Sequence, residues 1–114
     1  MGFIAALAMN PALVRTPYDP IRDFTPVSLV ASAQYVVTIH PSVPARTLKE
    51  YAAWVKANPA EGSFSTPGVG TLAYLLGLRF AADFGIELRH AAYRGSSPAI
   101  QDMVAGQLPM VLAA

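Results

Sequence analysis

The fold is decided by one continuous stretch, Ser63-Phe64-Ser65-Thr66-Pro67-Gly68-Val69-Gly70-Thr71. Residues 63–66 are typical of a short strand, and the proline and glycines after them are typical of a tight loop. From Thr71 the sequence predicts a helix to about Asp83, and Gly85 is placed to end that helix in a left-handed conformation. The predicted apolar side of the helix consists of Leu72, Leu75, Leu76 and Phe80.

The same succession of strand, loop and helix follows in the next part of the chain. Glu87 to Tyr93 is expected to form a strand, and the loop after it is Tyr93-Arg94-Gly95-Ser96-Ser97. Ser97 as N-cap and Pro98 at the first helical position predict that another helix begins there. The predicted buried stripe of that helix consists of Ile100, Met103 and Val104. Leu108 to Ala113 is expected to be a last apolar strand.

Upstream, a capping box marks the start of another helix. Thr47 stands three residues before Glu50, so each side chain can bond a free backbone amide near the other. Asn58-Pro59 is expected to end the helix. Its apolar residues recur at helical spacing and are Leu48, Tyr51, Ala52 and Val55.

The N-terminal third is rich in proline. Residues 10–26 contain Asn10-Pro11, Pro17, Pro20 and Pro26, which disfavour a long helix. Two β-branched, apolar runs follow, Val27–Ala31 and Tyr35–His40. Neither alternates cleanly between apolar and polar residues, so we expect both to be strands that are buried on both faces.

From residue 35 onward the expected order is β-α-β-α-β-α-β. Alternation of this kind predicts a parallel sheet with right-handed crossover connections. The predicted fold class is therefore α/β, a mostly parallel sheet with flanking helices.

Composition excludes several classes of function. The chain has 114 residues, a formal net charge of +1 and no cysteine, and charged residues make up only 13%. There is no charge excess for nucleic acid, and there is no thiolate for metal binding or catalysis. No stretch approaches the roughly 20 apolar residues of a membrane-spanning helix. The apolar opening run, residues 2–9, lacks the basic start of a signal peptide, so we expect it to begin a buried strand or helix.

The two loops after predicted strands are the candidate binding site. In parallel α/β sheets, ligands bind beyond the carboxyl ends of the strands, where helix N-termini present free amides. Backbone N–H groups, Ser and Thr hydroxyls and the cation of Arg94 would suit a carboxylate or another anion. The predicted ligand-binding residues are Ser65, Thr66, Gly68, Gly70, Thr71, Tyr93, Arg94, Gly95 and Ser96. Loops of this kind are also ordinary connections in α/β proteins, so an interpretation without any ligand stays open.

A nucleotide-binding interpretation is open as well. Residues 68–73 match the G-x-G-x-x-A form of the dinucleotide fingerprint. The acidic residue at the right distance is Glu87, but it stands at the start of the next predicted strand, whereas the fingerprint requires an acid at the end of that strand. Paired carboxylates, a nucleophile elbow and metal-binding histidine spacings are absent from the sequence. His40 and His90 stand at the end and in the middle of predicted strands. We therefore expect no catalytic residue, no metal site and no cofactor.

Several segments together resemble the extracytoplasmic solute receptors of tripartite tricarboxylate transporters, the Bug-type receptors. The more specific elements are Tyr18-Asp19-Pro20-Ile21-Arg22-Asp23-Phe24 and Tyr93-Arg94-Gly95-Ser96. Further matching segments are residues 10–13, 41–47, 65–71, 97–99 and 106–107. The similarity runs from about residue 6 to residue 109, although the chain is much shorter than members of that family.

The resemblance implies part of a periplasmic-binding-protein architecture of type II. Residues 1–34 would be the end of the first lobe and the start of the hinge crossover. Residues 35–114 would be the crossover strand and the first part of the second α/β lobe. Such receptors close about a hinge on a small organic carboxylate, perform no catalysis and deliver the solute to membrane permease subunits. The resemblance also implies a periplasmic location, without nucleic acid and without insertion into the membrane.

The sequence therefore leaves three functions open. The first is capture of a small di- or tricarboxylate by a receptor. The second is a nucleotide-binding enzyme fragment built on the loop Gly68-Val69-Gly70. The third is a remnant that binds no ligand and pairs with another chain through an exposed sheet edge.

Overall fold

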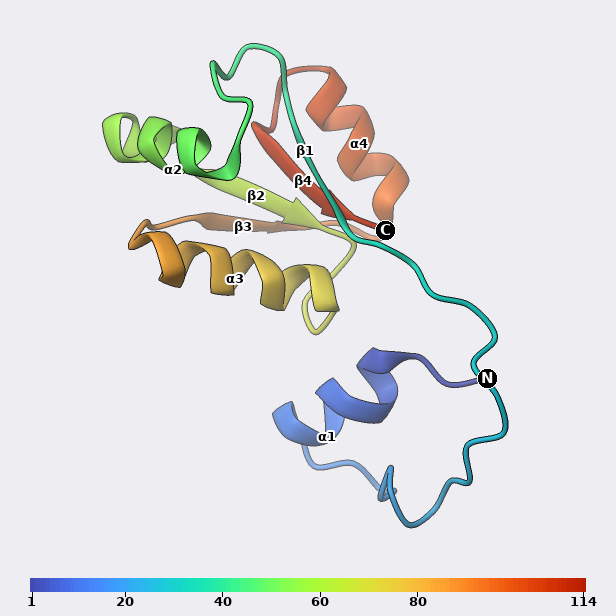
Figure 1. Ribbon diagram of the computed structural model, residues 1–114. Helices are drawn as coiled ribbons and strands as arrows, with labels where there is room; N and C mark the ends of the chain where they lie inside the picture. The colour runs from blue at the N-terminus through green and yellow to red at the C-terminus, as the bar shows by residue number, and fades with distance from the viewer.

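The computed structural model describes residues 1–114 and contains a four-stranded sheet with helices on both faces (Figure 1). The strands are β1 (Val36–Ile39), β2 (Ser63–Thr66), β3 (Arg89–Ala92) and β4 (Met110–Ala113). The helices are α1 (Asn10–Leu13), α2 (Leu48–Ala57), α3 (Leu72–Phe84) and α4 (Ser96–Val104). A π-helical turn (Ala5–Met9) precedes α1, and a 3-10 turn (Pro59–Glu61) follows α2. The chain has no helix with both the length and the apolar character that a membrane crossing requires.

The sheet has the order β1-β4-β2-β3, and it confirms the predicted α/β class. β2 pairs in parallel with both β3 and β4, whereas β1 pairs antiparallel with β4. The crossover from β2 to β3 and the crossover from β3 back to β4 run in opposite directions across the sheet. Right-handed connections then require α3 and α4 to cover opposite faces, as Figure 1 shows.

β1 corrects one expectation about burial. It forms within the predicted run Tyr35–His40, but it lies at the edge of the sheet and its residues alternate between exposed and half-buried. Val36 is 57% exposed. The prediction of burial on both faces was wrong because only one face of β1, which carries Val37 and Ile39, packs against the core, while the other face is exposed.

Local chemistry at the start of α2 is as predicted. The amide of Glu50 donates to Thr47 Oγ1 over 3.2 Å, and the Glu50 carboxylate accepts from the amides of Thr47 and Arg46 over 3.2 and 2.7 Å. The buried side of the helix consists of Tyr51, Ala52 and Val55, which pack into the core. The capping box therefore fixes the first residue of α2, and the apolar side chains determine which side of the helix faces the sheet.

α3 confirms its predicted ends and corrects its predicted face. Thr71 is the N-cap, and Gly85 ends the helix with φ +60°. The fully buried positions are Ala73 and Gly77, and not the predicted leucine side. A Cβ atom at Gly77 would lie 2.1 Å from Cε2 of Phe64, whose side chain is fully buried. Small residues on α3 therefore let the helix approach the sheet closely.

α4 differs from its prediction at its start and on its buried side. It begins at Ser96 with Gly95 as N-cap at φ +111°, and not after an N-cap at Ser97. Ala99 is its buried residue, while Ile100 and Val104 are 42% and 70% exposed. The left-handed conformation of Gly95 turns the chain earlier than the serine–proline signal indicates, and a small side chain then faces the sheet.

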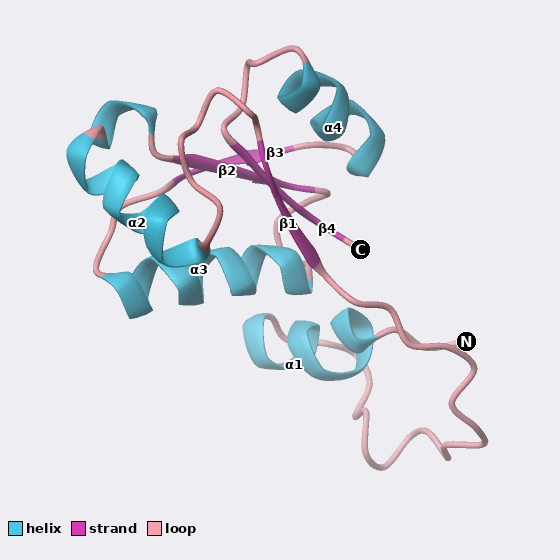
Figure 2. Cartoon of the chain, turned by 45° about the horizontal axis from the view of Figure 1, so that its top comes forward, coloured by secondary structure: helices cyan, strands magenta, loops and turns pink.

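Residues 1–34 lie apart from the sheet, beyond the end toward which β2 and β4 point (Figures 1 and 2). The apolar opening run forms the helical turn that leads into α1. The predicted strand Val27–Ala31 does not form: this run has no strand partner, and Val27 and Leu29 are 96% and 85% exposed. An extended segment becomes a strand only when a neighbour pairs with its backbone.

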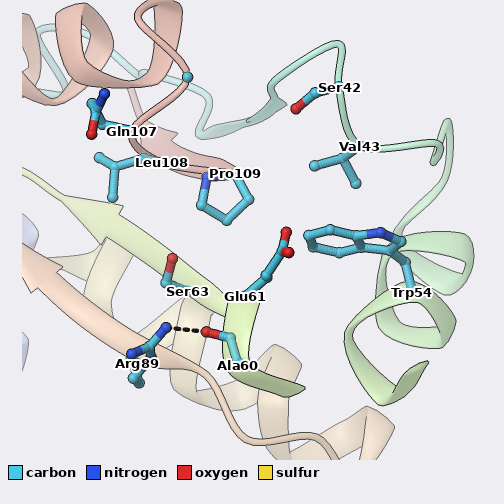
Figure 3. Close-up of a pocket in the computed structure, with 11 residues that line it drawn as sticks. Ser42, Val43, Trp54, Ala60, Glu61, Ser63, Arg89, Gln107, Leu108 and Pro109 are labelled. Carbon is cyan, nitrogen blue, oxygen red and sulfur yellow. Dashed lines mark hydrogen bonds between the residues drawn. The ribbon is translucent and has the colours of Figure 1, made fainter. Parts of the chain in front are cut away.

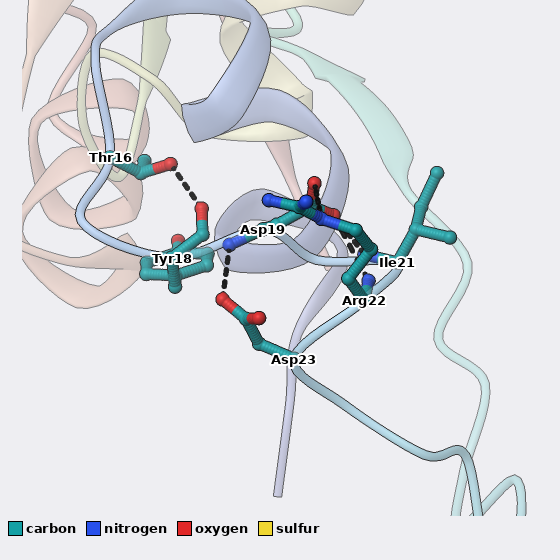
Figure 4. A network of polar contacts seen from close by, with 6 residues as sticks. All are labelled: Thr16, Tyr18, Asp19, Ile21, Arg22 and Asp23. Carbon is teal, nitrogen blue, oxygen red and sulfur yellow. Dashed lines mark hydrogen bonds and ion pairs between the residues drawn. The ribbon is translucent and has the colours of Figure 1, made fainter.

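The segment 16–23 folds on itself through its own polar groups (Figure 4). The Asp19 carboxylate accepts from the amides of Ile21 and Arg22 and pairs with the Arg22 guanidinium over 2.9 Å. Asp23 accepts in turn from the Asp19 amide over 2.7 Å. Tyr18 donates its hydroxyl to the carbonyl of Ala6 over 2.6 Å and thereby ties this turn to the first helical turn. These contacts give the Tyr18–Phe24 element a structural role.

We predict that acid opens this turn. Hydrogen bonds from the backbone amides of Arg22 and Ile21 hold the pKa of Asp19 below its ordinary value. A depressed pKa in the folded state means that the stabilisation is present above about pH 4 and is lost as the pH falls through the depressed value. A pH titration followed by NMR should show the Ile21 and Arg22 amides moving together with the Asp19 carboxyl. A normal or raised Asp19 pKa would contradict this account.

We also predict that Gly77→Ala destabilises the chain. Alanine in place of glycine ordinarily stabilises a helix by about 1 kcal/mol. Here the new methyl group would overlap the buried ring of Phe64, so the sign should reverse, with a loss of about 1–3 kcal/mol in urea unfolding. Leu78→Ala on the exposed side of α3 is the control and should change stability by about 0.5 kcal/mol or less.

Candidate functional site

The two predicted loops lie side by side. β2 and β3 are parallel, with Thr66 opposite Ala92, so the loops that follow these two strands leave the sheet at the same end. Two further hydrogen bonds continue the pairing into the loops: the Tyr93 amide donates to the Thr66 carbonyl over 3.1 Å, and the Gly95 amide donates to the Pro67 carbonyl over 3.3 Å. The loops 67–71 and 93–96 therefore form one continuous surface.

Two of the predicted site residues point inward. Ser65 and Thr66 are fully buried, and the Ser65 hydroxyl donates to the carbonyl of Met110 over 3.4 Å. The Thr66 hydroxyl contacts the carbonyl of Gly68 over 3.1 Å and the ring of His90 over 2.7 Å. Thr66 therefore supports the first loop from behind, whereas Ser65 bonds the neighbouring strand β4.

Thr71 and two glycines shape the outer part of the loops. The Thr71 hydroxyl donates to the Gly68 carbonyl over 2.7 Å and accepts from the amide of Tyr74 over 3.3 Å. Gly70 and Gly95 have φ values of +84° and +111°, a region that side chains other than glycine avoid. A side chain at either position would thus strain the turn that begins α3 or α4.

Free backbone amides gather on this surface. The N–H groups of Val69 and Gly70 donate to no acceptor in the chain, and the same holds for those of Arg94 and Ser96. The first set stands at the start of α3, a helix of 13 residues, where the helix dipole is positive. Free amides together with a helix N-terminus attract a carboxylate or a phosphate.

Arg94 is the cation of this surface. Its side chain is exposed and takes part in neither of the ion pairs of the chain, so it is free to bind an anion. The neighbouring Tyr93 hydroxyl donates to Oδ2 of Asp102 over 2.6 Å, and this hydrogen bond raises the pKa of Tyr93. The bond joins the second loop to the last turn of α4.

His90 is a polar residue of the site that sequence reasoning interpreted only as a core or sheet-face histidine. It is half-buried, with its ring centroid 4.9 Å from that of Phe64 and 4.6 Å from that of Tyr74. Burial lowers the pKa of His90. Phe64 lies opposite His90 on the paired strands. Because side chains alternate along a strand, Thr66 shares the face of Phe64, but its meeting with His90 depends on the register of β2 against β3.

A surface hollow of about 240 Å³ lies at the opposite end of the sheet (Figure 3). Its lining includes Trp54, Pro109 and two opposite charges, the carboxylate of Glu61 and the guanidinium of Arg89, which is bonded to the Ala60 carbonyl. These two charges balance, so the lining has no net positive charge that would attract an anion. This hollow is therefore separate from the two loops and has different chemistry.

The dinucleotide interpretation fails on geometry. Glu87 precedes β3 and so lies at the amino end of that strand, away from the glycine loop. A dinucleotide-binding site needs its ribose-binding acid at the carboxyl end of the strand next to the loop.

A mostly parallel four-stranded sheet with flanking helices matches part of the architecture of α/β periplasmic binding proteins. The whole chain, residues 1–114, matches the TctC family, described as the tripartite tricarboxylate transporter family receptor. The chain belongs to this family, which consists of binding proteins and not of enzymes.

Relatives and solved structures agree with this assignment. A protein from the tcbD–tcbE intergenic region of Pseudomonas sp. strain P51 is 38% identical over 98 residues, which are 86% of this chain and 29% of the relative. A structure described as a periplasmic transporter superimposes with a TM-score of 0.83 at 34% identity, covering 97% of this chain and 38% of that one. MatC from Rhodopseudomonas palustris with bound malate superimposes with a TM-score of 0.73 at 25% identity, covering 93% and 35%. The chain thus spans about a third of the length of these proteins.

We predict that Thr71→Ala weakens the start of α3. The substitution removes the hydroxyl that caps the helix and also holds the Gly68 carbonyl, so the free energy of unfolding should fall by about 1 kcal/mol. Urea unfolding followed by circular dichroism measures the change. Thr71→Ser keeps the hydroxyl and should stay close to the parent, whereas equal losses in both variants would contradict the capping role.

Proposed function

We propose that this chain supplies the carboxylate-facing part of a solute-binding receptor for a tripartite tricarboxylate-type transporter. The observation that carries the proposal is the convergence of free backbone amides and Arg94 on the joined loops 67–71 and 93–96. Such a surface offers hydrogen-bond donors and one positive charge, which match the acceptor oxygens of a carboxylate.

The ligand class we propose is a small di- or tricarboxylate. One carboxylate would lie against the amides of Val69 and Gly70 just before α3, and the charge of Arg94 would balance it. Support comes from the solved relative MatC, which holds malate. The proposed contact residues are Gly68, Gly70, Thr71, Tyr93, Arg94, Gly95 and Ser96, with Ser65 and Thr66 behind them.

We propose that the two parts of the chain belong to different lobes. Residues 1–34 would end the first lobe and begin the hinge crossover, and residues 35–114 would form the crossover strand and the first part of the second lobe. The position of residues 1–34 beyond the carboxyl ends of β2 and β4 supports this division (Figure 1). Closure of the lobes would enclose the solute. The loaded receptor, located in the periplasm, would then deliver the solute to permease subunits in the membrane.

Binding can be tested on the chain itself. We predict that malate or citrate stabilises it in a thermal-shift experiment, by about 2.7 kcal/mol at a hundred times the Kd.

By calorimetry, Arg94→Ala should weaken binding about tenfold, because it removes one charge-assisted hydrogen bond. Gly70→Val should also weaken binding, because valine disfavours a φ of +84°. Arg46→Ala is the matched control, since Arg46 is an exposed cation outside both loops and should not matter.

Other outcomes identify the alternatives. Stabilisation by NAD without any effect of carboxylates would favour nucleotide binding at the glycine loop. A chain that responds to no ligand and elutes only as an oligomer would favour a remnant that pairs through its sheet edges. Unchanged affinity in both Arg94→Ala and Gly70→Val would remove these loops from the carboxylate site.

A further inference from the structure

A second layer of hydrogen bonds lies behind the amide surface. The Nε2 atom of His90 is 2.7 Å from Thr66 Oγ1. Thr66 Oγ1 is in turn 3.1 Å from the carbonyl oxygen and 3.4 Å from the amide nitrogen of Gly68. The same carbonyl accepts from Thr71 Oγ1 over 2.7 Å. One imidazole and two hydroxyls therefore converge on the backbone of Gly68.

The protons in this cluster can be assigned by counting. A threonine hydroxyl has one proton to donate and two lone pairs that accept. The Gly68 carbonyl can only accept and the Gly68 amide can only donate, so Thr66 gives its proton to the carbonyl and accepts from the amide. One lone pair of Thr66 then remains for His90. All three contacts of Thr66 are hydrogen bonds only if His90 carries its proton on Nε2.

The setting of the His90 ring keeps this arrangement in place. The ring packs against Phe64 and Tyr74, which leaves it little freedom to rotate. Half-burial among aromatic rings disfavours the imidazolium, so the ring is neutral and carries a single proton. That proton is the one Thr66 needs.

Holding the Gly68 carbonyl also orients the next amide. The chain contains no cis peptide bond, and in a trans peptide the C=O and the N–H that follows point in opposite directions. The Gly68 carbonyl is bonded to Thr66 and Thr71, so the Val69 N–H points away from those hydroxyls. That N–H is one of the free amides of the candidate site.

We propose that His90 is a positioning residue: through Thr66 it locks the Gly68–Val69 peptide with the N–H toward the ligand and the carbonyl toward the protein. This inference rests on the proposed function for its link to binding. If the peptide flipped, a carbonyl oxygen would face the ligand where an amide proton now stands. A carbonyl repels a carboxylate, so the lock selects anions.

NMR spectroscopy on the full chain tests the lock without any ligand. The nitrogen shifts of the His90 ring should report the proton on Nε2, and residual dipolar couplings should report the orientation of the Val69 N–H. In His90→Phe, which keeps an aromatic ring but has no donor, the Val69 N–H should lose its fixed orientation. His90→Gln offers an amide N–H in place of Nε2 and should restore it. Thr66→Val should reproduce the effect of His90→Phe, and Thr66→Ser should not.

Calorimetry with malate adds the functional readout. His90→Phe and Thr66→Val should each weaken binding about three- to tenfold, the effect of one lost hydrogen bond, while His90→Gln stays within about threefold of the parent. Circular dichroism shows whether each variant is folded, and the NMR comparison is made only among folded variants.

The results separate the two proposals. A His90 proton on Nδ1, or a Val69 N–H that keeps its orientation in folded His90→Phe and Thr66→Val, would overturn the lock. Absence of malate binding in the parent chain would overturn the proposed function, while the NMR measurements would still decide whether the lock exists.

Discussion

The parallel pairing of β2 with β3 is the interaction on which the candidate site depends. Backbone hydrogen bonds fix the distance between neighbouring strands at about 4.8 Å, so two loops that follow these strands at the same end of the sheet lie next to each other. The pairing continues beyond the strands through the amides of Tyr93 and Gly95. α3 crosses closely over this pair of strands, because the absence of a side chain at Gly77 makes room for the Phe64 ring.

Sequence reasoning succeeded where the physical cause is local. The capping box of Thr47 and Glu50, the N-cap Thr71 and the left-handed Gly85 each act within one helical turn, and the structure has all of them as predicted. The order of strands and helices from residue 35 was predictable for a similar reason, because turn residues separate the apolar runs. The position of the two loops then followed from the general behaviour of parallel sheets.

The incorrect predictions concern features that depend on contacts between residues far apart in the sequence. Val27–Ala31 has the composition of a strand but no neighbour to pair with, and composition cannot supply one. α3 and α4 approach the sheet closely, and they do so with the small residues Gly77 and Ala99 facing it. Apolar periodicity instead predicts that the larger apolar side chains face the sheet. The second layer at His90 needed the register of β2 against β3, which only the folded chain defines.

An anion on an open surface keeps most of its water, and water weakens each hydrogen bond that the protein offers. In the proposed receptor, the loops of this chain would orient a carboxylate, whereas high affinity would require a second surface that closes over it. Orientation depends on donors that are already in place before the ligand arrives, since each group that must be ordered on binding costs free energy. Gly70 and Gly95 fix the outer turns, and Thr66, Thr71 and His90 hold the peptide beneath them. A rigid donor surface is what this part of the proposed receptor would contribute before closure, and the exposed Arg94 adds a full positive charge to the partial charges of the backbone amides.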